Sequence, residues 1–219
     1  MVLAFSIFAF DDRLIHLSGK KMLTVQFNQF PEIETNRLLL RQPTQNDADV
    51  LFRLRTNEVV MKYIGRPKPQ NREEVVTFID RIRKDFEQSL GITWIISTKK
   101  TGIAIGTMGL WRMDKENHRA EIGYLLDPEF QGLGMAAESM HAVLKYGFQE
   151  LNFHSIEANV DPLNEASKKL LLRAGFVQEG YFRESYFFEG KFLDSAIFGL
   201  LCHAYKTTVP SAFFSELRG

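Results

Sequence analysis

Apolar side chains recur at helical spacing in the first half of the chain. One helix is predicted over residues 72–88, where apolar positions lie four, three and four residues apart: Val75, Ile79, Ile82 and Phe86. An earlier helix is predicted to begin at Thr44, because a hydroxyl can accept an orphan backbone N–H and Asp47 favours the first turn. A strand at 37–42 precedes both helices.

The spacing then changes to that of β-strands. Runs rich in β-branched and aromatic residues, joined by short polar turns, predict three consecutive strands at 92–98, 103–113 and 118–127. A helix follows a pair of glycines, and a strand at 153–160 comes next. This three-stranded meander leading into a β-α-β unit predicts an α/β fold, a mixed sheet with helices on its faces.

The last elements are a helix and a closing hairpin. The helix covers 164–175, and one stripe of it is expected to face inward: Leu163, Ala166, Leu170 and Ala174. The hairpin turns at Glu189-Gly190. The full predicted order is β-α-α-β-β-β-α-β-α-β-β, with no internal repeat or long linker, so we expect one domain.

Chemistry is suggested first by the stretch YLLDPEFQGLGMAAESM at 124–140. Glycines that open a helix after a strand are typical of a phosphate site. Two patterns compete here: GLGMAA fits the dinucleotide motif G-x-G-x-x-A, and QGLGMA fits the coenzyme A motif Q-x-x-G-x-A.

The surrounding sequence argues against a dinucleotide fold. There the first glycine follows its strand almost directly, whereas five residues separate Leu126 from Gly132. That fold also needs an acidic residue about 20 positions on; Glu157 lies 157 − 132 = 25 positions after Gly132. The meander before the glycines and the hairpin after them do not match a repeated β-α-β unit either.

The coenzyme A interpretation agrees with a wider resemblance. DPEFQGLGMAAES, followed by NEASKKLLLRAGF, resembles the GCN5-related N-acetyltransferase (GNAT) superfamily, whose signature Q/R-x-x-G-x-G/A is matched by Gln131, Gly134 and Ala136. The resemblance runs from about Glu34 to Tyr205, and the segments ETNRLLLRQPT and EGYFRE are similar to the ribosomal-protein-alanine acetyltransferase branch. It implies a mixed, mostly antiparallel sheet of about seven strands.

The resemblance also implies domain limits and a coenzyme site. An acetyltransferase domain at 34–205 would lie between an N-terminal extension at 1–33 and a tail at 206–219. Acetyl-CoA is the implied cosubstrate. The residues implied to bind it are Leu125, Leu126, Gln131, Gly132, Leu133, Gly134, Met135, Ala136, Asn164 and Lys169. In this scheme, backbone N–H groups of Leu125 and Leu126 meet the thioester, and Lys169 meets a phosphate.

Two residues are implied to act in catalysis. Glu121 matches the carboxylate that relatives use to draw a proton from the amine, and Ser167 falls where relatives place a hydroxyl near the sulfur. Structural roles remain open beside these: a strand ion pair of Glu121 with Arg119 or a lysine, and helix capping by Asn164.

The acceptor implied by the branch is a protein N-terminal α-amine. A small amine, such as a polyamine, amino sugar or antibiotic, is the alternative, and a non-catalytic acyl-CoA-binding module is a third. Aromatic and long apolar side chains are candidates for the acceptor pocket: Trp111, Met113, Tyr181, Phe182, Tyr186 and Phe188. The five histidines show no ligand spacing, so we expect no metal.

Composition narrows the partners. A net charge of zero removes any general electrostatic case for nucleic acid or membrane binding. The single cysteine, Cys202, fits a reducing cytoplasm and is expected to be buried in a strand. A homodimer remains open. Residues 1–21 lack the basic region of a signal peptide and precede a second plausible start at Met22, so an added strand, an interface segment or an over-extended start all remain options.

Overall fold

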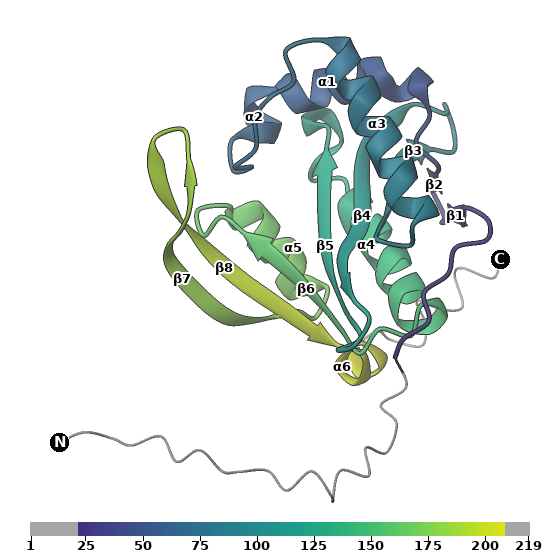
Figure 1. The fold of residues 1–219 in the computed structure, drawn as a ribbon, viewed down its shortest axis with the longest axis vertical. Coiled ribbons are helices and arrows are strands. Elements are labelled where there is room, and N and C mark those ends of the chain that lie inside the picture. The colour runs from purple at the N-terminus through teal and green to yellow at the C-terminus, as the bar shows by residue number, and fades with distance from the viewer. Residues whose placement is uncertain (1–21, 209–219) are drawn as a thin grey trace, which may run out of the picture.

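The fold is organised around a mixed sheet of eight strands (Figure 1), seen in a computed structural model that describes residues 22–208. The strands lie in the order β1-β2-β3-β4-β5-β6-β8-β7. Their bounds are Ile33–Glu34 (β1), Leu38–Arg41 (β2), Ile92–Thr98 (β3), Ala104–Asp114 (β4), Arg119–Leu126 (β5), Ser155–Val160 (β6), Val177–Phe188 (β7) and Lys191–Leu201 (β8). The mixed α/β sheet is confirmed, and the two-residue β1 adds a strand to the expected seven.

The four predicted helices are present, and shorter helical segments that were not predicted, such as Glu58–Met61 and Cys202–Thr208, occur beside them. Together they are η1 (Gln45–Asp47), α1 (Ala48–Thr56), α2 (Glu58–Met61), α3 (Arg72–Glu87), η2 (Pro128–Phe130), α4 (Met135–Lys145), the π-helical turn η3 (Tyr146–Glu150), α5 (Glu165–Arg173) and α6 (Cys202–Thr208). The predicted start at Thr44 is confirmed, because its backbone N–H donates to Asp47 Oδ2 at 2.8 Å in a capping box.

The helices cover opposite faces of the sheet, and β3 shows this most clearly. Its Ile95 packs in a cluster with Ala48 of α1 and Val75 of α3. The flanking Trp94 and Ile96 lie in the core that contains α4 and α5 residues. Since successive side chains of a strand point to opposite faces, α1 and α3 lie on one face of the sheet, and α4 and α5 on the other.

The sheet splits in its middle, between β5 and β6. These parallel strands pair only from Arg119↔Ser155 to Glu121↔Glu157. Beyond that point β5 continues to Leu126 beside β4, while β6 stays with β8. The two halves of the sheet therefore diverge in a V that opens toward α2, as Figure 1 shows.

Two expectations about the second half of the chain are wrong, the first of them in part. Of the predicted inward stripe, Ala174 is buried and Leu170 packs partly against the core, but Leu163 is 73% exposed and Ala166 is exposed as well. Ala166 and Leu170 line the cleft described below, and the residues that α5 itself buries are Ser167 and Leu171. Cys202 begins helix α6 and is half-buried, rather than buried in a strand.

The described part of the N-terminal extension packs on the domain. Val25 is buried, and the ring of Phe27 stacks on Phe86 of α3 with 4.8 Å between centroids. Residues 22–33 therefore contribute to the same core as the predicted domain. The expectations for residues 1–21, and for the tail beyond 208, lie outside the described residues.

Candidate active site

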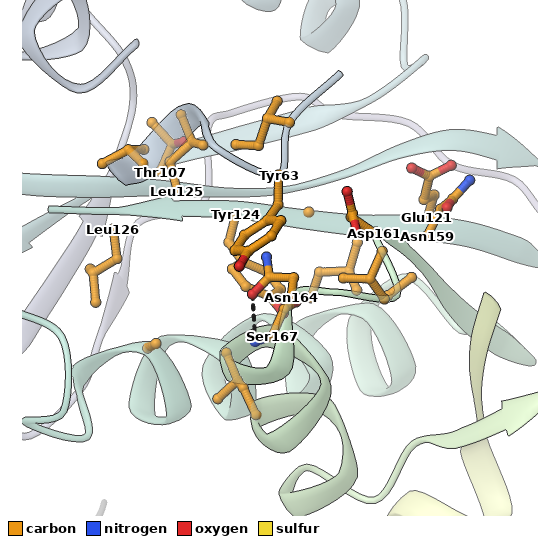
Figure 2. A pocket seen from close by; sticks show the side chains of 18 of the residues that line it. Tyr63, Thr107, Glu121, Tyr124, Leu125, Leu126, Asn159, Asp161, Asn164 and Ser167 are labelled. Carbon is orange, nitrogen blue, oxygen red and sulfur yellow. Dashed lines mark hydrogen bonds between the residues drawn. The ribbon is translucent and has the colours of Figure 1, made fainter. Parts of the chain in front are cut away.

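The split between β5 and β6 forms part of a cleft of about 1360 Å³. Pockets for single small ligands are usually ~300–1,000 Å³, so this cleft has room for a coenzyme arm and an acceptor. Among the aromatic candidates, Trp111, Phe182 and Tyr186 line it. The lining does not include Met113, Tyr181 or Phe188. Figure 2 shows Tyr63, Tyr124, Asn164 and Ser167 gathered in the cleft, with Glu121 farther along β5.

The loop that follows β5 is built around two glycines. Gly132 and Gly134 have positive φ angles of 74° and 77°, a backbone conformation that is strained for residues with a Cβ. Gly134 is the N-cap of α4, so the first N–H groups of that helix have no carbonyl partner within it. Such N–H groups and the positive end of the helix dipole attract anions. This geometry fits the pyrophosphate of coenzyme A.

The six predicted loop residues divide into two groups. Gln131, Gly132, Gly134 and Ala136 line the cleft. Leu133 is 54% exposed, and Met135 packs against the core, so these two can contribute through the backbone only. The side chain of the signature glutamine closes the end of the strand, since Gln131 Nε2 donates to the carbonyl of Leu126 at 3.1 Å.

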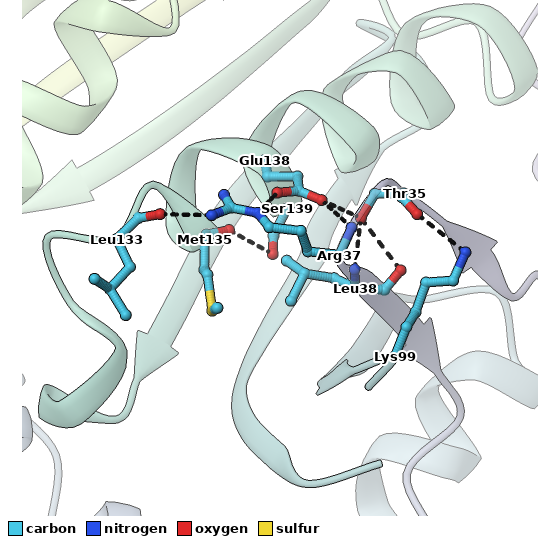
Figure 3. Close-up of polar contacts among 8 residues, drawn as sticks. All are labelled: Thr35, Arg37, Leu38, Lys99, Leu133, Met135, Glu138 and Ser139. Carbon is cyan, nitrogen blue, oxygen red and sulfur yellow. Dashed lines mark hydrogen bonds and ion pairs between the residues drawn. The ribbon is translucent and has the colours of Figure 1, made fainter. Parts of the chain in front are cut away.

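An ion-paired cluster holds this loop against the N-terminal strands (Figure 3). The Arg37 guanidinium donates from Nε to Glu138 Oε2 at 2.7 Å and from Nη1 to the Leu133 carbonyl at 2.9 Å. Thr35 Oγ1 donates to the same carboxylate at 2.6 Å. Burial acts to raise the pKa of the Glu138 carboxyl, but the hydrogen bonds from Thr35 and Arg37 outweigh it and lower that pKa. The cluster thereby ties α4 and the glycine loop to the turn between β1 and β2.

Backbone alternation along β5 decides which N–H groups face the split. Asp127 N–H donates to the Ile105 carbonyl at 2.8 Å, so Asp127 points its backbone groups toward β4. Because backbone groups alternate in direction along a strand, those of Leu125 also face β4. The backbone groups of Tyr124 and Leu126 face the split between β5 and β6. The geometry therefore favours Leu126 over Leu125 as the predicted thioester contact.

The register of β4 and β5 sorts side chains between the two faces. Trp111 lies opposite Glu121, and Thr107 opposite Leu125, and all four line the cleft. Met108, opposite Tyr124, belongs to the core on the α4 and α5 face. Glu121 therefore lies on the α1 and α3 face of β5, and Tyr124 on the face of α5.

Glu121 is nearly buried and has an arginine partner. It is 9% exposed, and Arg112 Nη1 donates to its Oε2 at 2.7 Å. Arg112 lies in an irregular part of β4 with a φ of 48°. The expected partner Arg119 instead pairs with Glu157. The contact with Arg112 fixes the orientation of the Glu121 carboxylate at the cleft.

Tyr124 is a candidate that the sequence analysis missed. Its hydroxyl lies 2.6 Å from Ser167 Oγ. Burial raises the pKa of Tyr124 to about 12, and the hydrogen bond with Ser167 acts in the opposite direction. The structure thus joins the predicted Ser167 hydroxyl to a phenol. A tyrosine in a strand is ordinary for sheet formation, so only the fold distinguishes it.

The start of α5 holds the remaining predicted residues. Asn164 caps the helix, since its Oδ1 accepts the Ser167 N–H at 3.1 Å. It also lines the cleft, so capping and coenzyme contact are compatible. Lys169 lines the cleft as well, whereas Lys168 donates to Glu165 at 2.7 Å.

Residues 22–208 contain neither a candidate metal site nor a membrane-spanning helix. No group of three or more His, Cys, Asp or Glu side chains there could hold a metal ion. No helix in that range is long and apolar enough to span a bilayer.

Comparisons with known proteins agree with this geometry. A family model described as "Acetyltransferase (GNAT) domain" matches residues 37–177. The uncharacterized N-acetyltransferase YoaA of Bacillus subtilis is 38% identical over 150 residues, covering 68% of this chain and 85% of that protein. A GNAT-family acetyltransferase structure from Bacillus anthracis superposes with a TM-score of 0.71 at 25% identity, covering 79% and 99% of the two chains. RimL, a ribosomal L7/L12 α-N-protein acetyltransferase solved with coenzyme A, shares the fold at a TM-score of 0.73 and 19% identity over 80% and 99%. This chain belongs to the GNAT acetyltransferase family and is an acetyl-CoA-dependent N-acetyltransferase.

Proposed function

We propose that this enzyme transfers acetyl from acetyl-CoA directly to a primary amine, with a protein N-terminal α-amine as acceptor. One observation carries the proposal. The carboxylate of Glu121 lies on one face of β5, and the hydroxyl pair of Tyr124 and Ser167 lies on the other. Acetyl transfer needs a proton acceptor on the amine side of the thioester and a donor on the sulfur side, and the split sheet separates two groups of these kinds.

The proposed reaction forms a C–N bond as the C–S bond of the thioester breaks. Glu121 accepts a proton from the attacking amine, directly or through water. The N–H of Leu126 is positioned to stabilise charge that develops on the thioester oxygen. The departing thiolate takes up a proton, so the products are an acetylated amine and a free thiol.

Tyr124 and Ser167 are proposed to act on the sulfur. A phenol with a pKa of about 12 stays protonated at neutral pH and can donate a hydrogen bond to a thiolate. A free thiol has a pKa of about 8.5, so complete proton transfer from Tyr124 would be unfavourable. We assign Tyr124 the role of hydrogen-bond donor, with Ser167 orienting its hydroxyl.

Tyr124→Phe is expected to lower kcat by about 10- to 150-fold, because one hydrogen bond to a charged group contributes ~1.5–3 kcal/mol. Assays of thiol release between pH 6 and about 10 would measure kcat of the variant and of the wild type. Since burial raises the pKa of Tyr124 to about 12, the wild-type profile should show no fall from this group below pH about 10. Ser167→Ala, which leaves the phenol in place, should have the smaller effect. A Tyr124→Phe enzyme with the wild-type kcat would contradict the assignment.

The acceptor class is inferred from structural neighbours and relatives. RimL and a ribosomal-protein-S5-alanine acetyltransferase of Vibrio fischeri are among the structural neighbours, which favours a protein N-terminus. Spermidine N(1)-acetyltransferase of Escherichia coli is also among the relatives, so a small amine is the second candidate.

A thiol-release assay separates these alternatives. Acetyl-CoA would be combined with peptides that differ at the N-terminal residue, the same peptides with a blocked α-amine, spermidine and an amino sugar. We expect release with free N-termini and none with blocked ones. Faster release with spermidine would replace the proposed acceptor. Tight acetyl-CoA binding with no thiol release for any amine would mean a binding module and contradict transfer altogether.

A further inference from the structure

Three arginines line the cleft on the side of α1 and α3. Arg55 comes from α1, Arg66 from the loop after α2, and Arg81 from α3. Among residues 22–208, none of the three guanidinium groups makes an ion pair or a hydrogen bond. Most other arginines of this region pair with a carboxylate, as Arg37 and Arg112 do. The cleft therefore has a wall with unneutralised positive charge.

Two of the arginines, Arg55 and Arg81, share one aromatic ring. The Arg55 guanidinium lies 4.2 Å from the centroid of Phe78, and that of Arg81 lies 5.2 Å from the same ring. Burial, followed by the positive charges of Arg66 and Arg81, lowers the pKa of Arg55. Packing like charges around one ring is unfavourable unless an anion neutralises them. Arg55 is half-buried and Arg66 and Arg81 are exposed in the cleft, so the three guanidinium groups are accessible to an anion that enters it.

The acidic groups of the cleft do not neutralise this wall. Asp85 of α3 and Asp161 after β6 also line the cleft, but neither is within ion-pair distance of the three arginines. Glu121 is already paired with Arg112. Lys62, also a lining residue, adds to the positive charge, with its ammonium over the ring of Tyr63.

The position of the wall separates it from the proposed coenzyme site. The glycine loop begins α4, and Lys169 lies on α5. Both helices cover the face of the sheet opposite to α1 and α3. Glu121, the proposed proton acceptor, lies on the same face as the arginines. An anion bound at the arginines would therefore belong to the acceptor rather than to the phosphates of the coenzyme.

We propose that the acceptor amine carries an anionic group, a carboxylate or a phosphate, which Arg55, Arg66 and Arg81 bind while the amine lies at Glu121. This deepens the proposed function and rests on it. Guanidinium groups suit both anions because their planar N–H donors match carboxylate and phosphate oxygens in pairs. A polyamine, which carries only positive charge, would be repelled by the same wall.

Matched acceptors and variants test the proposal. Acetylation rates would be compared for phosphoethanolamine against ethanolamine, and for a C-terminally amidated Ala-Asp-Asp peptide against amidated Ala-Asn-Asn, so that the second peptide carries no carboxylate. Arg81→Gln should lower kcat/KM for whichever anionic acceptor is used by about tenfold or more, as for a charge-assisted hydrogen bond. It should leave unchanged both kcat/KM for the matched acceptor that lacks the anionic group and the KM of acetyl-CoA. Arg66→Gln, in an exposed loop, provides a second variant that removes no packing around Phe78.

Arg83→Gln is the matched control. Arg83 is exposed on the same helix, and it does not line the cleft. It removes the same net charge, so an equal effect of Arg81→Gln and Arg83→Gln would overturn the proposal. A rise in the KM of acetyl-CoA alone would assign the arginines to the coenzyme and overturn it too. Faster acetylation of phosphoethanolamine than of ethanolamine would identify the anion as a phosphate, and faster acetylation of the aspartate peptide than of the asparagine peptide would identify it as a carboxylate. Equal rates for all four acceptors would contradict both identifications.

Calorimetric titration of the coenzyme A-loaded protein keeps this test independent of turnover. Phosphoethanolamine and the aspartate peptide are the anionic probes. Ethanolamine and the asparagine peptide are their matched partners without an anionic group. Binding of an anionic probe that exceeds binding of its partner and is weakened by Arg81→Gln supports the anion site, even if no amine is acetylated and the proposed function fails. No preference for either anionic probe would overturn the anion site even if amines are acetylated.

Discussion

Glu121→Gln is expected to lower kcat by about 10²- to 10⁴-fold, the usual contribution of a general base, while the Kd of acetyl-CoA stays at the wild-type value. Glutamine keeps the size of the side chain and can still contact Arg112, but it cannot accept the proton of the attacking amine. Steady-state thiol release at saturating substrates would measure kcat, and calorimetry would measure acetyl-CoA binding. A variant that binds acetyl-CoA and turns over at the wild-type rate would refute the base assignment.

Glu157→Gln provides a control with the same chemistry. Glu157 lies directly beside Glu121 in the register of β5 and β6, and it too is paired with an arginine, Arg119. It lies outside the cleft lining. Both substitutions remove a strand carboxylate from an ion pair, so losses of stability should be similar, and only Glu121→Gln should slow the chemistry. If both variants lose the same activity, the effect is structural and the base assignment is wrong.

The parts of this molecule that could be predicted from sequence are local. The apolar stripe of α3 recurs every three or four residues, and the Thr44 capping box spans only four residues. Short stretches of sequence are therefore enough to predict both. The glycine loop was predicted because its signature lies within one stretch, 131–136. Its geometry now fits an anion site, with both glycines at positive φ.

The features that were missed depend on register and on distant residues. Tyr124 and Ser167 lie 43 positions apart, and Arg37 and Glu138 lie 101 apart. No local period predicts either contact. The α5 face was predicted only in part for a related reason: Ala166 and Leu170 line the cleft, although Leu170 also packs against the core, and a sequence pattern cannot distinguish a cleft wall from a core.

Gly134→Val is the second substitution with a large expected effect, here on coenzyme binding. At a φ of 77°, a β-branched residue is strained by about 1–3 kcal/mol. The backbone can relieve that strain only by moving N–H groups away from the anion. The new Cβ would also lie 3.4 Å from Arg37 Nη2, within the cluster that holds the loop. If the loop moves, this strain corresponds to an increase in the Kd of acetyl-CoA of about 5- to 150-fold.

Gly102→Val separates backbone strain from coenzyme binding. Gly102 lies in the turn between β3 and β4 at a φ of 68°, with no atom within 4 Å of an added Cβ. Both variants should lose stability in urea denaturation, since both place a branched residue at positive φ. Only Gly134→Val should weaken acetyl-CoA binding in calorimetry, and its kcat at saturating acetyl-CoA should fall far less than that of Glu121→Gln. Wild-type affinity in Gly134→Val would mean that the glycine loop begins a helix without holding the pyrophosphate, and the coenzyme site would have to be sought elsewhere in the cleft.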